Sequence, residues 1–128
     1  MPEFAQFVAL IGTDDAFRLP DDQNYDTRGF SFDLANLDPE RTVLLMFKVA
    51  ASGNANLRMS FAESGSSVDF SLNSPPGQLE PRSWHEIVPK NILRASGNRL
   101  LVVGTPLENG AFMSVSDIVI LYHATTAD

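Results

Sequence analysis

The sequence contains no cysteine, and this absence excludes disulfide bonds and thiolate metal sites. Stability must therefore come from a packed core. A long apolar segment is also lacking, because the longest apolar run, residues 42–51, is interrupted by Lys48 and is far shorter than the roughly 20 residues of a membrane-spanning helix. The first residues, MPEFAQFVALIG, contain no basic residue, so they do not predict a secretory signal.

Basic residues are scarce in the first third of the sequence. Residues 1–40 hold nine acidic side chains against Arg18 and Arg28, whereas the rest of the chain is balanced, and the net charge is −7. A negative field repels phosphate groups, and the basic residues form no stripe. We therefore expect neither nucleic acid nor a membrane among the partners.

Helical periodicity is absent as well. Short segments instead alternate apolar and polar residues with the period of two that marks a half-buried strand, most clearly at 30–34, 57–61 and 68–72. Their spacing predicts an all-β fold, an antiparallel two-sheet β-sandwich of the jelly-roll type with about eight or nine strands. We expect one domain over residues 1–128, with fewer than about one residue in ten helical.

The strand assignments follow from this alternation and from the turn residues between the segments. The expected strands are residues 4–11, 16–19, 29–34, 42–51, 57–61, 68–72, 83–88, 99–103 and 112–123. Ser52-Gly53-Asn54 predicts a tight reversal, so that 43–61 forms a hairpin. Residues 73–82, which contain three prolines, predict an irregular crossover. The predicted core is Phe32, Leu45, Phe47, Val49, Leu93, Leu100 and Ile120.

One segment resembles a known family. From Trp84 an aromatic strand leads to Pro89, a leucine, a Gly97-Asn98 turn and a new strand, with matches also at Ile87, Leu93, Leu100 and Val102. This pattern is similar to that of galactose-binding-domain-like jelly rolls, and 115–122 looks like the last strand of that family. The resemblance implies a jelly-roll fold and a carbohydrate-binding or accessory role.

Catalytic motifs are not found in the sequence. Ser116, Asp117 and His123 are the residue types of a nucleophilic triad, but on a regular strand the odd-numbered pair faces away from Ser116. We therefore expect no enzyme, no cofactor and no obligate metal. A structural calcium is a minority hypothesis, because related carbohydrate-binding sandwiches hold one and carboxylate donors are present at Asp14, Asp15, Asp21, Asp22, Asp26 and Asp117.

Candidate ligand-binding residues lie mainly in expected loops. Tyr25 offers a ring for stacking against a sugar, and Arg28 offers a planar fork of donors for adjacent hydroxyls. The complete set is Asn24, Tyr25, Arg28, Trp84, His85 and Asn109. The alternatives are that Arg28 forms a surface ion pair with Asp26 or another of its acidic neighbours, and that Trp84 is a core residue. Since Trp84 and His85 are consecutive, one of them should be exposed.

Two functions are compatible with these observations. The first is a non-catalytic module that binds carbohydrate through loops at one end of the sandwich. The alternative is an assembly module that contacts a partner protein or a second copy, because residues 43–49 and 118–123 are apolar on both faces. A monomer with an exposed aromatic in a concave loop cluster favours the first, and a large apolar interface favours the second.

Overall fold

The computed structural model describes residues 3–61, 67–74 and 81–125, and this part of the chain is built from β-strands. The strands are β1 (Glu3–Ala9), β2 (Phe17–Leu19), β3 (Thr27–Phe32), β4 (Val43–Phe61), β5 (Ser67–Ser74), β6 (Arg82–Val88), β7 (Asn98–Pro106) and β8 (Phe112–Thr125). The single 3-10 turn η1 (Thr13–Asp15) is the only helical segment in the described ranges, which confirms the all-β prediction. Within those ranges no helix has the length and apolar character needed to cross a membrane.

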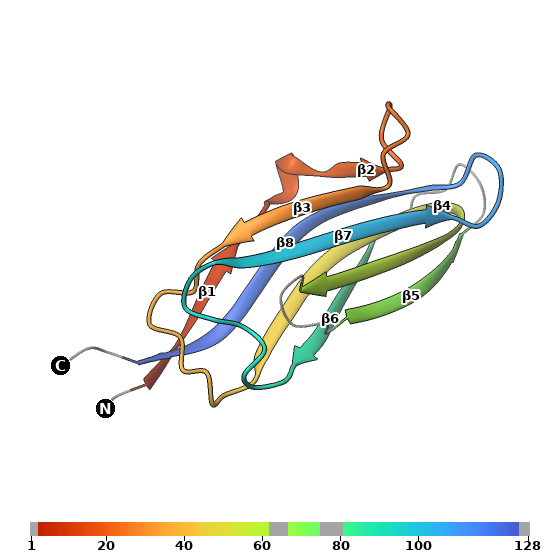
Figure 1. Cartoon of the computed structure of the whole chain (residues 1–128). Helices are drawn as coiled ribbons and strands as arrows, with labels where there is room; N and C mark the ends of the chain where they lie inside the picture. Colours follow the sequence, from red (N-terminus) through yellow and green to blue (C-terminus); the bar gives the residue numbers. More distant parts are fainter. Residues whose placement is uncertain (1–2, 62–66, 75–80, 126–128) are drawn as a thin grey trace.

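The strands form two antiparallel sheets that share β4 (Figure 1). Sheet A has the order β1, β8, first half of β4, β6, and β2 pairs with the beginning of β8. Sheet B has the order β3, β7, second half of β4, β5. The chain thus alternates between two sheets in the order of a jelly roll, as the sequence predicts. The first and last described residues lie side by side (Figure 1), because Glu3 pairs with Thr125.

The predicted hairpin at 43–61 is wrong, because β4 continues through Gly53 without reversing. Ser52 is the last β4 residue paired with β8 in sheet A, and Gly53 is the first paired with β5 in sheet B. Gly53 has a φ of +79°, a conformation that L side chains rarely adopt. The Ser52-Gly53-Asn54 sequence therefore supplies the backbone freedom for a change of sheet, which requires the same residue types as a tight turn.

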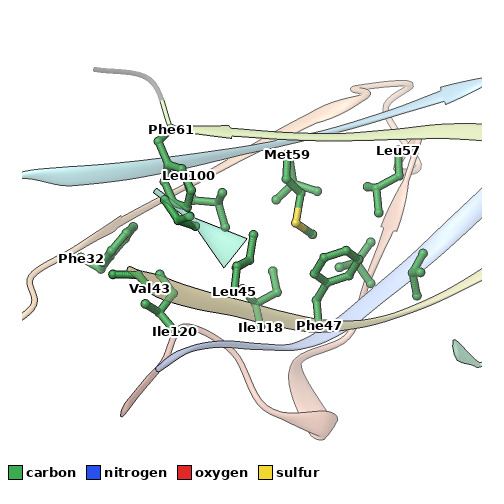
Figure 2. Close-up of a cluster of buried hydrophobic side chains, with 14 of the residues drawn as sticks. Phe32, Val43, Leu45, Phe47, Leu57, Met59, Phe61, Leu100, Ile118 and Ile120 are labelled. Carbon is green, nitrogen blue, oxygen red and sulfur yellow. The ribbon is translucent and has the colours of Figure 1, made fainter. Parts of the chain in front are cut away.

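The core lies between the two sheets and consists of their inward side chains. Figure 2 shows Leu45, Phe47 and Ile120 from sheet A pointing toward Leu57, Met59 and Leu100 from sheet B. Every predicted core residue is buried, and Leu45, Leu100 and Ile120 are completely so. The alternation of β8 is also confirmed, since Ile118, Ile120 and Tyr122 are buried whereas Val119, Leu121 and His123 are half-buried on the other face.

Two turn predictions need correction. The crossover at 73–82 is shorter than expected, because Asn73 and Ser74 belong to β5 and Arg82 begins β6, while residues 75–80 lie outside the described part. The predicted Gly97-Asn98 turn would allow a positive φ at both residues, but only Gly97 has one. Asn98 is buried at the start of β7, where its side chain accepts a hydrogen bond from the Arg94 backbone N–H at 2.9 Å and donates one to the Arg94 carbonyl at 2.6 Å. The asparagine therefore closes the loop with its side chain.

Candidate functional site

Two ordered loops meet at the end of the sandwich opposite the two chain ends (Figure 1). The loop after β2 is folded around Asp21, whose carboxylate accepts hydrogen bonds from the backbone N–H groups of Gln23 and Tyr25, both at 2.9 Å. The loop after β7 is tied to β4 by Glu108, which accepts from the Asn54 N–H at 2.9 Å. Because both loops are held by hydrogen bonds, the surface between them is preformed.

We call this surface the loop groove. It has a volume of ≈ 360 Å³, and its lining consists of Arg18, Pro20, Asp21, Asn24, Pro106, Glu108, Asn109, Gly110 and Ala111. Arg18, Asn24 and Asn109 bring donor groups, and the prolines and Ala111 bring apolar surface. The Arg18 guanidinium lies over the Phe112 ring, 4.0 Å from its centroid, which fixes the cation at the edge of the groove.

The structure brings Asn24 and Asn109 together and leaves Tyr25 and Arg28 outside the groove lining. Tyr25 is 62 % exposed in the same loop. Arg28 lies over the rings of Phe17 and Phe30, with its guanidinium carbon 4.8 and 5.7 Å from the centroids. Since Arg28 covers aromatic rings at the margin of the core, this contact differs from the ion pair with Asp26 that the sequence left open.

Trp84 and His85 lie in β6, away from the loop groove. Trp84 faces the core side, is half-buried and donates from its indole N–H to Glu86 at 3.4 Å. His85 is exposed on the outer side of sheet A, where it pairs with Met46. The expectation that one of these two is exposed is confirmed, and the two side chains point to opposite faces of the strand.

The acidic residues are not gathered into a metal site in the described ranges, where no three His, Cys, Asp or Glu side chains are close enough to hold an ion. Asp21 is engaged with backbone amides of its own loop. Asp117 accepts from the Ser116 hydroxyl at 3.1 Å and forms an ion pair with Lys48 at 3.8 Å. Its positive φ of 51° interrupts the regular strand assumed from sequence, so Ser116 and Asp117 are in contact, although His123 is not part of this pair.

A second surface covers the outer side of sheet A. The sequence indicated it only because residues 43–49 and 118–123 are apolar on both faces. Residues directly opposite in antiparallel strands share a face, and the pairs Phe7 with Leu121, Leu121 with Leu44, and Leu44 with Ile87 form one row across four strands. Val119 and Met46 belong to the adjacent row. We call these side chains the outer apolar patch: Phe7, Leu44, Met46, Ile87, Val119 and Leu121.

The outer side of sheet B has a different composition. Its described positions in β3 and β4 are Thr27, Ser31, Asn54, Asn56, Arg58 and Ser60, and β7 adds Arg99 and Thr105 next to the half-buried Leu101 and Val103. A polar outer face is what a solvated sheet normally carries. The two faces of the same sandwich therefore differ in polarity.

The fold and the two surfaces define a jelly-roll β-sandwich with a preformed groove at one end. No family model matches the sequence, and no curated protein is similar to it at a significant level. The resemblance to galactose-binding-domain-like jelly rolls therefore stays a prediction from the sequence.

The solved structures with similarity to this chain include the following two. The dimeric latent PorU from Porphyromonas gingivalis matches with a TM-score of 0.66 and 15 % identity over 97 % of this chain, and this chain spans 13 % of the length of PorU. The carbohydrate-binding module TmCBM61, solved with β-1,4-galactotriose, matches with a TM-score of 0.44 and 12 % identity over 98 % of this chain and 89 % of its own. The similarity to PorU shows that this sandwich fold occurs in other proteins.

Proposed function

We propose that this chain is a non-catalytic binding module that recognises carbohydrate in the loop groove. The observation that supports this function is the convergence of Arg18, Asn24 and Asn109 on one preformed hollow of ≈ 360 Å³. Sugars present hydroxyl groups in pairs, and planar guanidinium and amide groups can donate to such pairs. The apolar walls from Pro20, Pro106 and Ala111 offer contact for the C–H patches of a sugar ring.

The hydrogen bonds that hold the two loops in place support the same function. The Asp21 and Glu108 carboxylates are already bound to backbone N–H groups, so the loops need not be fixed when the ligand arrives. A binding surface that is preformed loses less conformational entropy on association. Tyr25 is exposed in the same loop, and we propose that its ring contacts a ligand that extends beyond the groove.

The test is a glycan-array screen of the purified protein, followed by calorimetric titration of each glycan that binds. The double variant Asn24→Gly with Asn109→Ala should weaken binding by about tenfold or more, because two amides are removed at about 1 kcal/mol or more each. Glycine is chosen at Asn24 because the backbone φ there is 64°. Gln23→Ala, in the same loop but outside the groove lining, is the matched control and should bind like the parent protein.

Two results contradict the proposed function. One is an array on which no glycan binds at any protein concentration used. The other is a glycan whose affinity is the same for the double variant and for the parent protein.

Assembly through protein contacts is the second candidate function. The observation that favours it is the outer apolar patch of sheet A. The outer apolar patch lies on a sheet face rather than in the loops, so the two functions do not compete for one surface.

A further inference from the structure

We propose that the outer apolar patch of sheet A binds a second copy of this chain, sheet against sheet. The patch is exposed within the described structure, where Phe7 is 66 % and Ile87 68 % accessible. Contiguous apolar surfaces of this kind on soluble proteins mark interaction sites. The polar outer face of sheet B shows that the fold itself does not require apolar residues on an outer face.

The patch has the form of a continuous layer of side chains. Phe7, Leu121, Leu44 and Ile87 stand side by side on four hydrogen-bonded strands, and two shallow hollows of ≈ 250 and ≈ 270 Å³ lie on this face. Two such layers pack face to face about 10 Å apart in β-sandwiches. Sheet B covers the inner face of sheet A with a layer of apolar side chains, and the outer apolar patch of a second copy can cover its outer face in the same way.

The absence of charge on the patch suits a second copy, because the two facing patches are then both uncharged and apolar. The protein carries a net charge of −7, yet the patch contains no charged residue, and the ion pair between Lys48 and Asp117 lies at its border. A strongly basic protein would find no acidic group to bind on the patch, and an acidic partner would find no basic one. Two copies that meet at this neutral face keep the acidic loop 21–26, which lies at the loop-groove end of the sandwich, away from the contact.

The area of the face sets the size class of this contact. Four strands about 4.8 Å apart and about seven residues long at 3.3 Å each give a planar area on the order of 400 Å² per copy. Side chains that protrude raise the accessible area above this value, toward the roughly 800 Å² per partner of a standard stable interface. We therefore expect a weak dimer in exchange with the monomer, which forms in the micromolar range or above.

Sedimentation equilibrium of the full chain over a wide concentration range tests the proposal. The mean mass should rise with concentration from 14.0 kDa toward twice that value. Raising the salt concentration should strengthen the association, because the repulsion between two acidic copies is screened while the apolar contact persists.

Ile87→Asp places a charge in the patch and should shift the dissociation constant by at least tenfold toward the monomer. Leu107→Asp is the matched control, since Leu107 is an apolar side chain that is 57 % exposed in the β7–β8 loop outside the patch, and this variant should associate like the parent. Circular dichroism melting curves establish that both variants are folded.

Three results overturn the proposal. The first is a parent protein whose mass stays at the monomer value up to the solubility limit, which leaves the patch to a different protein. The second is an association that Ile87→Asp leaves unchanged. The third is an equal loss of association in Ile87→Asp and Leu107→Asp, because a general increase in negative charge would then explain both.

Discussion

Single residues of β4 determine how the core is filled. Leu45, Phe47 and Val49 point inward and are buried, whereas Leu44 and Met46, at alternate positions, point outward. This arrangement was predictable from the sequence, because side-chain direction in a strand alternates with a period of two and needs no knowledge of which strands pair.

Phe47→Ala should lower the free energy of unfolding by about 3–5 kcal/mol, because a buried ring is removed and the surrounding sheets cannot close the space. Phe47 is 2 % exposed. Urea denaturation measures the loss, and Phe7→Ala, with a ring that is 66 % exposed, is the control that should cost about 0.5 kcal/mol or less at low protein concentration. A loss below about 1 kcal/mol for Phe47→Ala would show that the ring is not in the core.

Tyr122 gives the stability a dependence on alkaline pH. Its hydroxyl donates to the Ala35 carbonyl at 3.0 Å, and burial raises the pKa of Tyr122 above its ordinary value of 10.0. The folded state therefore holds the phenolic proton more tightly than the unfolded state does. The resulting stability is fully present below the unfolded pKa of 10.0 and is lost as the pH rises through the higher folded pKa.

The corresponding measurement is urea denaturation at a series of pH values on both sides of pH 10.0. The free energy of unfolding should fall more steeply with pH in the parent protein than in Tyr122→Phe, which has no phenolic proton to lose. Tyr25→Phe, where the ring is exposed, should follow the parent. Identical slopes for the parent and Tyr122→Phe would contradict the assignment.

The candidate site could be predicted only in part at this scale. Asn24 and Asn109 could be named because they are polar residues in turn-rich segments, but the sequence does not tell which loops meet. Arg18 was missed, since it alternates with Phe17 and Leu19 in a strand and its place beside the groove depends on the pairing of β2 with β8. Arg28 was expected at the site, and its contacts with Phe17 and Phe30 depend on the packing of β2 near β3.

At the scale of elements, the long strand β4 connects the two sheets. The sequence predicted strands on both sides of Gly53 correctly and their connection wrongly. A reversal and a change of sheet both need a residue that accepts a positive φ, and the difference between them lies in the partners: β8 and β6 before Gly53, β5 and β7 after it. These partners are distant in sequence, so no local pattern distinguishes the two outcomes.

Gly53→Ala should therefore destabilise the protein more than Gly97→Ala does. Both residues have a positive φ, +79° and +74°, which costs an alanine about 1–2 kcal/mol. A Cβ at Gly53 would also lie 2.6 Å from the Glu108 carboxylate, which accepts from Asn54, whereas nothing lies within 4 Å of a Cβ at Gly97. Thermal denaturation of both variants measures the difference, expected at about 1 kcal/mol or more. Equal losses would show that the contact with Glu108 does not restrict the site.

At the scale of the whole molecule, the sandwich has one polar and one apolar outer face. The sequence indicated the apolar outer face, because residues 43–49 and 118–123 are apolar on both faces. Neither segment shows the alternation of polar and apolar residues that is typical of a solvated strand. The sequence could not indicate that these residues join Phe7 and Ile87 in one patch, since this depends on the register of β1 with β8 and of β6 with β4.

The central claim is that sheet A is the face through which this protein associates. The most direct test is to record amide chemical shifts of ¹⁵N-labelled protein across a dilution series. The account predicts that the amides of Phe7, Leu44, Ile87 and Leu121 shift with protein concentration, whereas those of Arg58 and Leu101 on the outer face of sheet B do not. Shifts that are independent of concentration, or that are equally large on sheet B, would contradict it.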